Sequence, residues 1–246
     1  MLLTRPVHAR DEIAEALRAA GASVDLVPLI RIAPPRDEAA LRSAAAAADT
    51  ADWIAFTSAN GVAAFARARS EPLASHPKIA AIGPATAAAI EELLHRRPAL
   101  VSKRSVAEAL AEEIAAIGPP YASIAIFQAQ GARPQLAEQL SAAGFSVIAT
   151  SAYATIESPP ADLIQHLRVA DAIVLTSGSG ARSLALGLAA DSGLRALTGK
   201  TVACIGAVTA REARRCGIAV AVTARNASGR GVVDALVAGR ATPSRR

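Results

Sequence analysis

The sequence predicts an α/β protein with two similar domains, each a parallel sheet in a three-layer arrangement, joined by a two-stranded flexible linker. Apolar runs of strand type alternate with Ala-rich helical patterns, and 52% of the 246 residues are hydrophobic, which is enough for a sizeable core. One stretch also occurs twice: DWIAFTSANGVAAFA at Asp52–Ala66 returns as DAIVLTSGSGARSLA at Asp171–Ala185. Because 6 of the 15 positions are identical, the repeat indicates an internal duplication.

Each copy of the repeat is a strand that breaks into a Thr-Ser-x-x-Gly turn and then continues as a helix. Such a turn lies at the carboxyl end of its strand, where the first backbone N–H groups of the next helix have no partners within that helix. These groups suit anions such as carboxylates and phosphates. Two related turns in one chain therefore predict one ligand, held in a cleft between two domains.

The first part of the chain has a βαβ pattern. Its predicted elements are the strand Leu2–Thr4, the helix His8–Ala20 and the strand Ser23–Ile32. Gly21 stops the helix, and Pro34-Pro35 forms a stiff connection after the second strand.

Strands and helices then alternate as far as a break at Gly118-Pro119-Pro120. Ser105 is a suitable N-cap for the last helix before this break. Short connections between alternating elements predict a parallel sheet covered on both faces. The elements predicted here are the helix Asp37–Ala48, the strand Asp52–Thr57, the helix Gly61–Ala68, the strand Lys78–Ile82, the helix Ala87–Leu94, the strand Leu100–Val101 and the helix Val106–Ala116.

From Ser123 the same order of elements starts again, with a period of roughly 120 residues. A second proline pair, Pro159-Pro160, takes the place of the first, and Gly239 onward reads as a frayed tail. The predicted elements are the strand Ile124–Phe127, the helix Arg133–Ala143, a strand from Ser146 through Tyr153, the second copy of the repeat, a copy of Ile79–Ala87 at Val202–Ala210 and the strand Val220–Ala224.

Periodicity leaves two domain divisions open. If the chain changes domain at each proline pair, one domain is continuous and the other combines both ends of the chain. The alternative is two sequential domains that divide near Gly118.

Composition narrows the class of protein. Arginine dominates the 26 basic residues and alanine is abundant, which genomic composition bias explains, so the net charge of +5 is weak support for an anionic ligand. Nucleic acid is disfavoured, because no basic run is interleaved with aromatic residues and no zinc-finger spacing occurs.

Only two cysteines occur, Cys204 in an apolar strand pattern and Cys216 beside Gly217, and we expect both to be buried thiols of a reducing compartment. No CxxC pair and no Cys/His cluster is present, so no metal is expected. The N-terminus lacks a long apolar segment, and no apolar run approaches about 18 residues. We expect a cytoplasmic protein without a membrane span.

Two Thr-Ser turns and two Ile-Gly-x-x-Thr-Ala turns place four helix N-termini at the predicted cleft, with small hydroxyls beside them. The alternative for each hydroxyl is an N-cap or turn residue that satisfies local backbone. The candidate ligand-binding residues in these turns are Ser58, Asn60, Gly61, Thr86, Ser177, Ser179, Gly180 and Thr209.

Several motifs, in their order and spacing, resemble the uroporphyrinogen-III synthase family, the cyclising enzymes of tetrapyrrole biosynthesis. These motifs are LLTRP, PLIRI, DWIAFTSANGV, IAAIGPATA, the strand that carries Tyr153, IVLTSGSGA and VACIGAVTA. The resemblance covers nearly the whole chain and implies interleaved domains. Residues 1–33 with 161–246 would form the first domain and residues 37–157 the second, with linkers at 34–36 and 158–160.

The resemblance also implies a hydro-lyase that acts on hydroxymethylbilane without a metal or an organic cofactor. The hydroxyl of the hydroxymethyl group on ring A leaves as water to give an azafulvene-like cation, which ring D joins at its substituted carbon. Ring D then closes inverted, through a spiro intermediate, to give uroporphyrinogen III. We expect a monomer that receives the bilane by transient handover from hydroxymethylbilane synthase.

Tyr153 breaks the internal symmetry, since Ile30 stands at its position in the first copy and the chain has only two tyrosines. In the family, a tyrosine on this strand is thought to assist departure of the hydroxyl as water, so the resemblance implies this role for Tyr153. A phenol is a weak acid, and its contribution to the rate should be about a hundredfold. The alternative is a strand tyrosine packed at a domain edge.

Two arginines are weaker candidates. Arg5 follows the first strand and could hold a carboxylate or brace the turn. The turn GlnAlaGlnGlyAlaArgPro departs from the family pattern, which is often richer in glycine and has an acidic residue after the arginine. The resemblance therefore assigns no role to Arg133.

Two other classes of protein are weighed against the enzyme. A non-enzymatic two-lobed binding protein or sensor for an anionic small molecule would also have duplicated α/β domains and proline linkers. A Rossmann-type nucleotide enzyme is disfavoured, because Ser183 stands where the third glycine of the fingerprint would be and no P-loop occurs.

Overall fold

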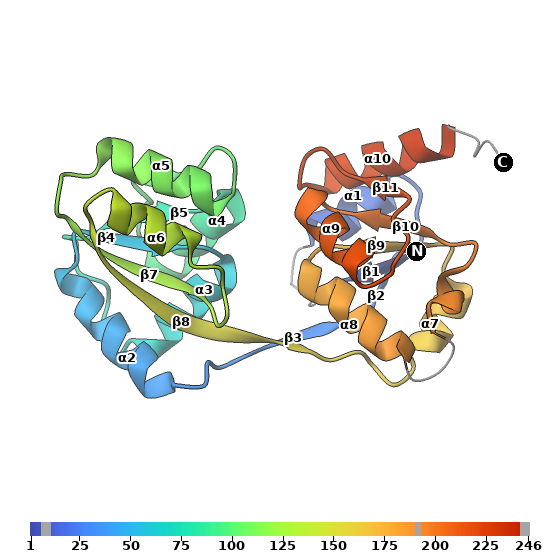
Figure 1. The fold of residues 1–246 in the computed structure, drawn as a ribbon, viewed down its shortest axis with the longest axis horizontal. Helices are drawn as coiled ribbons and strands as arrows, with labels where there is room; N and C mark the ends of the chain where they lie inside the picture. The colour runs from blue at the N-terminus through green and yellow to red at the C-terminus, as the bar shows by residue number, and fades with distance from the viewer. Residues whose placement is uncertain (6–10, 190–192, 242–246) are drawn as a thin grey trace. The chain divides into compact units, whose positions relative to one another are not determined.

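The computed structural model describes residues 1–5, 11–189 and 193–241. The chain divides into two compact units: unit 1 comprises Met1–Arg31 and Ile156–Arg246, and unit 2 comprises Ile32–Thr155 (Figure 1). The chain thus passes from unit 1 into unit 2 and back again. In the described part of the chain, no helix combines the length and the apolar character that a membrane crossing needs.

Unit 1 is built on a parallel sheet with the strand order β11-β10-β9-β1-β2. Its strands are β1 (Leu2–Thr4), β2 (Asp25–Leu26), β9 (Ala172–Leu175), β10 (Thr201–Cys204) and β11 (Val222–Thr223). Its helices are α1 (Glu12–Ala19), α7 (Leu163–Val169), α8 (Gly178–Ala189), the short 3-10 helix Gly193–Leu197, α9 (Ala207–Arg215) and α10 (Gly229–Ala241).

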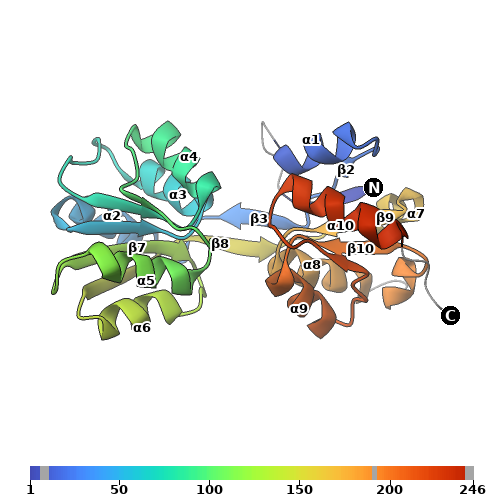
Figure 2. The same cartoon turned by 90° about the horizontal axis from the view of Figure 1, so that it is seen from above.

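Alternating strand residues give this sheet two apolar faces. Ile173 and Leu175 pack with residues of α7, α8 and α9, whereas Leu3 and Val174 pack with α1 and α10. Figure 2 shows α1 and α10 on one side of the sheet and α8 and α9 on the other. Unit 1 therefore has three layers.

Unit 2 is built on a six-stranded sheet with the order β3-β8-β7-β4-β5-β6, in which β3 and β8 also include residues 30–31 and 156–157 of unit 1. The strands are β3 (Ile30–Ala33), β4 (Trp53–Phe56), β5 (Lys78–Ala81), β6 (Leu100–Val101), β7 (Ser123–Ala129) and β8 (Ser146–Glu157). The pairs from β8 to β6 are parallel, and β3 runs in the opposite direction beside β8 (Figure 2). The helices are α2 (Glu38–Ala47), the 3-10 turn Ala48–Thr50, α3 (Ala59–Ala68), α4 (Pro84–Leu94), α5 (Ala107–Ile117) and α6 (Gln135–Ala142).

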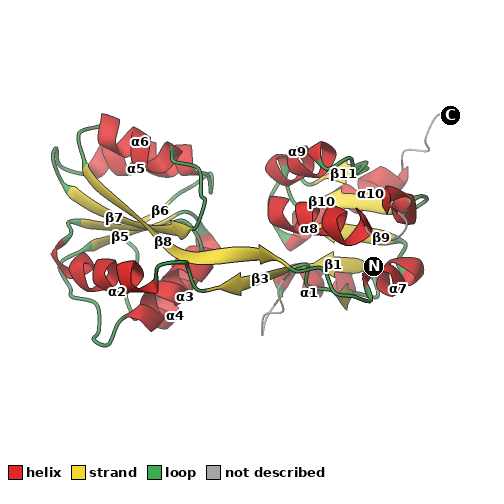
Figure 3. Ribbon diagram, turned by 60° about the horizontal axis from the view of Figure 1, so that its bottom comes forward, coloured by secondary structure: helices red, strands yellow, loops and turns green. Residues whose placement is uncertain are grey.

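The sheet of unit 2 is also covered on both faces. Ile54 and Phe56 pack with residues of α2, α3 and α4, and Trp53 and Ala55 pack with α5 and α6. Figure 3 shows these two groups of helices on opposite sides of the sheet. Phe56, Phe65 and Phe127 form an aromatic cluster in the first of these cores, with ring centroids 4.6 to 5.7 Å apart.

The two sheets place equivalent strands in the same order. In the repeat, β1, β2, β9, β10 and β11 correspond to β7, β8, β4, β5 and β6. The orders β11-β10-β9-β1-β2 and β6-β5-β4-β7-β8 are therefore the same order of equivalent strands. In each unit, the two strands that carry the repeated turns are neighbours.

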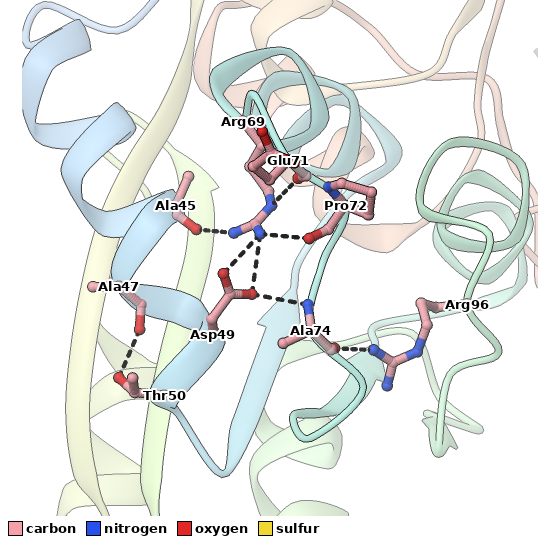
Figure 4. Close-up of polar contacts among 9 residues, drawn as sticks. All are labelled: Ala45, Ala47, Asp49, Thr50, Arg69, Glu71, Pro72, Ala74 and Arg96. Carbon is pink, nitrogen blue, oxygen red and sulfur yellow. Dashed lines mark hydrogen bonds and ion pairs between the residues drawn. The ribbon is translucent and has the colours of Figure 1, made fainter.

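The Arg69 side chain joins α2 and the turn after it to the loop that follows α3 (Figure 4). The Arg69 guanidinium donates to both carboxylate oxygens of Asp49, at 2.9 and 3.0 Å, and to the carbonyls of Ala45, Glu71 and Pro72. Burial opposes the negative charge of Asp49, but the bonds from Arg69 and from the Ala74 N–H outweigh it and lower the pKa of this carboxyl.

Asp52, the first residue of the repeat, joins the starts of β4 and β7. Its Oδ2 accepts the backbone N–H of Ser123 at 2.8 Å and the Ser123 hydroxyl at 2.7 Å. The Asp52 N–H in turn donates to Ser123 Oγ at 3.0 Å. Hydrogen bonds from Ser123 to the ionised form therefore lower the pKa of Asp52.

The prediction of a single strand at Ser23–Ile32 is wrong. It forms two strands, β2 in the first sheet and β3 in the second, with Val27–Leu29 between them. Val27 still donates to the Leu3 carbonyl at 3.0 Å, but Pro28 has no N–H and cannot continue the ladder. The chain leaves the first sheet at this proline.

Several predicted element ends also differ. The helix predicted from His8 begins at Glu12 with Asp11 as its N-cap, and residues 8–10 lie outside the described residues. The prediction of Ser105 as an N-cap is wrong: Val106 is the N-cap of α5, and Ser105 has a left-handed φ of 49°. The strand predicted at Val220–Ala224 is limited to Val222–Thr223.

The prediction of a frayed tail from Gly239 is wrong for residues 239–241, because α10 continues to Ala241. A Cβ at Gly239 would lie 2.4 Å from Cγ1 of Val222, so this glycine lets the helix pack closely on β11. Residues 242–246 lie outside the described residues.

The two cysteines differ in burial. Cys204 is buried in the core of unit 1, and burial raises the pKa of its thiol to about 11. Cys216 is only half-buried, contrary to the prediction, because it lies at the end of α9 and not in a strand. Burial, followed by the nearby Glu212 carboxylate, raises the pKa of Cys216 as well.

We predict that Asp52→Asn destabilises the protein at neutral pH and that the difference from the wild type shrinks in acid. The folded pKa of Asp52 lies below its ordinary value of 3.8, so the unfolded state binds the proton more readily. Its stabilising contribution is present above that value and is lost as the pH falls through the folded pKa. Urea unfolding midpoints from pH 7 to pH 2.5 would check this, and a difference that is constant over the range would contradict it.

Candidate functional site

In unit 2, the predicted site residues lie at the carboxyl edge of the sheet. Ser58 is the N-cap of α3 after β4, and Asn60 and Gly61 lie in the first turn of this helix. Thr86 lies in the first turn of α4 after β5 and is buried. Because β4 and β5 are neighbours in parallel, both helix N-termini lie at the same edge.

Ser58 joins this helix N-terminus to Tyr153. Ser58 Oγ accepts the backbone N–H of Gly61 at 3.0 Å and donates to Tyr153 Oη at 3.0 Å. Tyr153 is only 8% exposed. The structure therefore brings together the phenol and the Thr-Ser turn, which are 95 residues apart in the sequence.

An irregularity in β8 decides which way Tyr153 faces. Gln128 pairs with Ser151, but the next residue, Ala129, pairs with Tyr153, so Ala152 is left over as a bulge. Ala152 and Tyr153 are both buried in the same core cluster, although consecutive residues of a regular strand face opposite sides. The bulge thus turns Tyr153 toward the face that carries Ser58.

Gly61 allows α3 to approach β7 closely. A Cβ at this position would lie 3.1 Å from the Phe127 carbonyl oxygen and 3.4 Å from Ser58 Oγ. The backbone N–H of Gly61 could not reach the serine as easily with a larger residue there. The glycine of the repeated turn therefore supports the cap.

Unit 1 has a similar arrangement without a phenol. Ser177 Oγ accepts the N–H of Gly180 at 3.0 Å and lies 3.1 Å from Ser179 Oγ. A Cβ at Gly180 would lie 3.6 Å from the Thr4 carbonyl oxygen, the counterpart of the close approach at Gly61. Ser177 therefore shares its hydroxyl with a second serine, where Ser58 meets a tyrosine.

The two Ile-Gly turns differ from the Thr-Ser turns in their caps. The N-caps of α4 and α9 are Gly83 and Gly206, and neither supplies a side-chain hydrogen bond. Thr86 and Thr209, in the first turns of these helices, are 3% and 6% exposed. These helix N-termini leave backbone N–H groups without side-chain caps.

The environments of these two glycines are not the same. A Cβ at Gly83 would lie 2.4 Å from Ser105 Oγ, whereas at Gly206 nothing lies within 4 Å. Ser105 thus packs against the N-terminus of α4 in place of capping α5. This contact could not be predicted from the sequence, because it depends on how the loop after β6 folds back.

The two arginine candidates have carboxylate partners. Arg5 Nε lies 3.3 Å from Oδ2 of Asp11, and Oδ1 of the same aspartate caps α1 by accepting from Ile13 and Ala14. This contact fits the bracing alternative for Arg5, and a role in carboxylate binding stays a prediction. Arg133 forms an exposed pair with Glu108 at 3.8 Å.

Sequence reasoning missed an ion-pair network in unit 1. Arg182 Nε donates to Glu157 at 2.6 Å and Arg182 Nη1 donates to Glu212 at 3.1 Å. The hydrogen bond to Glu157, followed by the bond to Glu212, raises the pKa of Arg182. One signal could have indicated it: Arg182 stands where the other copy of the repeat has Ala63.

Two cavities differ in their relation to these residues. A cavity of about 640 Å³ in unit 1 is lined by Met1, Ala172 and Thr201, at the amino ends of the strands and so away from the turns. A smaller one of about 130 Å³ in unit 2 lies beside Tyr153, against Pro34, Pro35 and residues of α2 and α3. Across the described residues, no three His, Cys, Asp or Glu side chains gather as metal ligands would.

This is the arrangement of α/β proteins that bind small molecules at the carboxyl edges of parallel sheets. The family model described as Uroporphyrinogen-III synthase HemD matches residues 11–234. The chain therefore belongs to the uroporphyrinogen-III synthase family.

Solved structures agree in fold. A mutant uroporphyrinogen III synthase from the extremely thermophilic bacterium Thermus thermophilus is 17% identical over 98% of this chain and 98% of its own, with a TM-score of 0.62. A uroporphyrinogen-III synthetase from Helicobacter pylori 26695 is 16% identical over 96% of this chain and 98% of its own, with a TM-score of 0.63. No curated protein matches the chain.

Proposed function

We propose that this chain carries out the reaction of its family, the cyclisation of hydroxymethylbilane to uroporphyrinogen III, with Tyr153 as the proton donor. Membership of the family supports the reaction and the substrate. The hydrogen bond from Ser58 to Tyr153 is the observation that supports the role of the phenol.

The hydrogen bonds around Ser58 leave the phenol proton free to act. The Gly61 N–H donates to Ser58 Oγ, and the Ser58 hydroxyl donates to Tyr153 Oη. Because the tyrosine oxygen accepts in this bond, its own O–H can donate to another group. A phenol held in this way suits a general acid.

In the proposed first step, the Tyr153 proton passes to the hydroxyl oxygen on ring A of the bilane. The C–O bond breaks, water leaves, and an azafulvene-like cation remains. The substituted carbon of ring D then attacks this cation and forms a spiro intermediate. The original bond from this carbon to the methylene bridge of ring C then breaks, and the unsubstituted α-carbon of ring D bonds to that bridge, which leaves ring D inverted. The proton lost from this carbon restores the pyrrole and returns to the Tyr153 phenolate.

The acetate and propionate groups of the bilane need donors, and the helix N-termini supply them. We propose that α4 and α9, which begin without side-chain caps, bind carboxylates through backbone N–H groups. Thr86 and Thr209 would add hydroxyl donors. Ser177, Ser179 and Gly180 would bind at the N-terminus of α8, as Ser58, Asn60 and Gly61 would at α3.

Positioning of the substrate is the main catalytic effect in this proposal. A bilane with a reactive hydroxymethyl group can close by itself without inversion, so the protein must present the substituted carbon of ring D to the cation. Direct handover from hydroxymethylbilane synthase would shorten the time available for the uninverted closure, and this handover stays a prediction.

We predict that the purified protein converts freshly made hydroxymethylbilane mainly into the type III ring system. Inversion of ring D is the outcome that spontaneous closure does not give, so it reports on catalysis directly. Separation of the isomers by chromatography would check this. A product that is only type I, in the presence of bound bilane, would instead indicate a binding protein.

We predict that Tyr153→Phe lowers kcat about a hundredfold and leaves KM nearly unchanged, because a general acid acts mainly on the transition state. The chain offers a matched control in Tyr121→Phe, since Tyr121 is 86% exposed. Wild-type turnover by Tyr153→Phe would remove the assignment.

We predict that Ser58→Ala lowers kcat by about fivefold to tenfold, because one hydrogen bond of ~1 kcal/mol holds the phenol. It should also lower the unfolding free energy by about 1 kcal/mol through loss of the α3 cap. Ser228→Ala is the control: Ser228 Oγ accepts the N–H of Gly231 at 3.1 Å, so this variant loses the same kind of cap without a phenol. Equal turnover of the two variants would contradict the proposal.

A further inference from the structure

Gln130 lies where two segments of unit 2 meet. It follows β7 directly and is half-buried. Its backbone N–H donates to the Tyr153 carbonyl at 2.7 Å, and its side-chain Oε1 accepts the backbone N–H of Arg36 at 2.9 Å. One residue thus contacts both the segment by which the chain enters unit 2 and the strand by which it leaves.

The bond to Arg36 fixes the entering segment at a specific point. Pro34 and Pro35 have no N–H groups, so Arg36 supplies the first backbone donor after the proline pair. Pro35 is buried and lines the 130 Å³ cavity together with Tyr153. The Gln130 side chain therefore holds this segment next to the tyrosine.

The bond to Tyr153 lies just beyond the bulge in β8. The ladder between β7 and β8 loses its regular register at Ala152, and Ala129 pairs with Tyr153. The Gln130 N–H bond to the Tyr153 carbonyl follows immediately. It fixes the backbone of Tyr153 at the place where the side chain has been turned toward Ser58.

We propose that Gln130 is a positioning residue for Tyr153. Its side chain binds the entering segment, which immobilises the Gln130 backbone and so holds Tyr153 Oη against Ser58 Oγ. The inference rests on the proposed role of Tyr153 as the proton donor. An acceptor oxygen is all that the Arg36 bond requires of the side chain, so glutamate can replace glutamine and alanine cannot.

The first experiment measures the hydrogen bond from the Arg36 N–H to the Gln130 side chain. Arg36 amide exchange with deuterium, followed by NMR, should speed up about fivefold in Gln130→Ala, because the acceptor is lost, and should remain slow in Gln130→Glu. Gln128→Ala, two residues earlier near the end of β7, is the matched control; in the described part of the chain, the Gln128 side chain makes no hydrogen bond. Unchanged Arg36 exchange in Gln130→Ala would overturn the proposal.

The second experiment measures catalysis. Gln130→Ala should lower kcat about tenfold with little change in KM, since a displaced catalytic group affects mainly the chemical step. Gln130→Glu should recover most of the wild-type kcat, and Gln128→Ala should have the kcat of the wild type. Full turnover in Gln130→Ala, in a protein whose Arg36 exchange shows that the bond to residue 130 is lost, would overturn the positioning role.

A double variant separates this proposal from the one it rests on. If Gln130 acts through the phenol, Gln130→Ala should cause no further loss in Tyr153→Phe. A full additional tenfold loss in that background would overturn the positioning role but leave the catalytic tyrosine in place. Wild-type turnover of the single Tyr153→Phe variant would overturn both.

Discussion

The hydrogen bond between Ser58 and Tyr153 depends on three separate features of unit 2. Gly61 lets α3 lie close to the Phe127 carbonyl, because a Cβ at this position would be only 3.1 Å from that oxygen. Ser58 then caps the helix and keeps its own proton for the phenol. The bulge at Ala152 turns Tyr153 toward it. Loss of any one of these features would separate two groups that lie on different elements.

The two units share their order of strands but differ at this bond. Both units place a Thr-Ser turn and an Ile-Gly turn on neighbouring parallel strands. Ser177, however, meets Ser179 at 3.1 Å, whereas Ser58 meets Tyr153. Both units thus carry the same helix N-termini, which we propose bind anions, and only unit 2 adds a phenol on β8, which we propose is the acid.

Each of the two segments that connect the units forms hydrogen bonds within a unit. In unit 1, Arg182 bonds Glu157 at the end of β8, and the Ser158 N–H donates to the Leu29 carbonyl at 2.9 Å. In unit 2, Gln130 bonds both Arg36 and Tyr153. In unit 2, the backbone of Tyr153 is thus joined through Gln130 to the segment that enters the unit.

The sequence alone determined the alternation of strands and helices, the repeated turns and the single tyrosine that breaks the repeat, because these depend on periodicity and on residues adjacent in the chain. Pro28 could also have indicated the division of Ser23–Ile32 into two strands, since it removes a backbone donor. Only the tertiary structure decided the bulge at Ala152, the contact of Ser105 with Gly83 and the bonds of Arg182 and Gln130. These join residues far apart in the sequence, and their partners are chosen by packing, which leaves no local pattern.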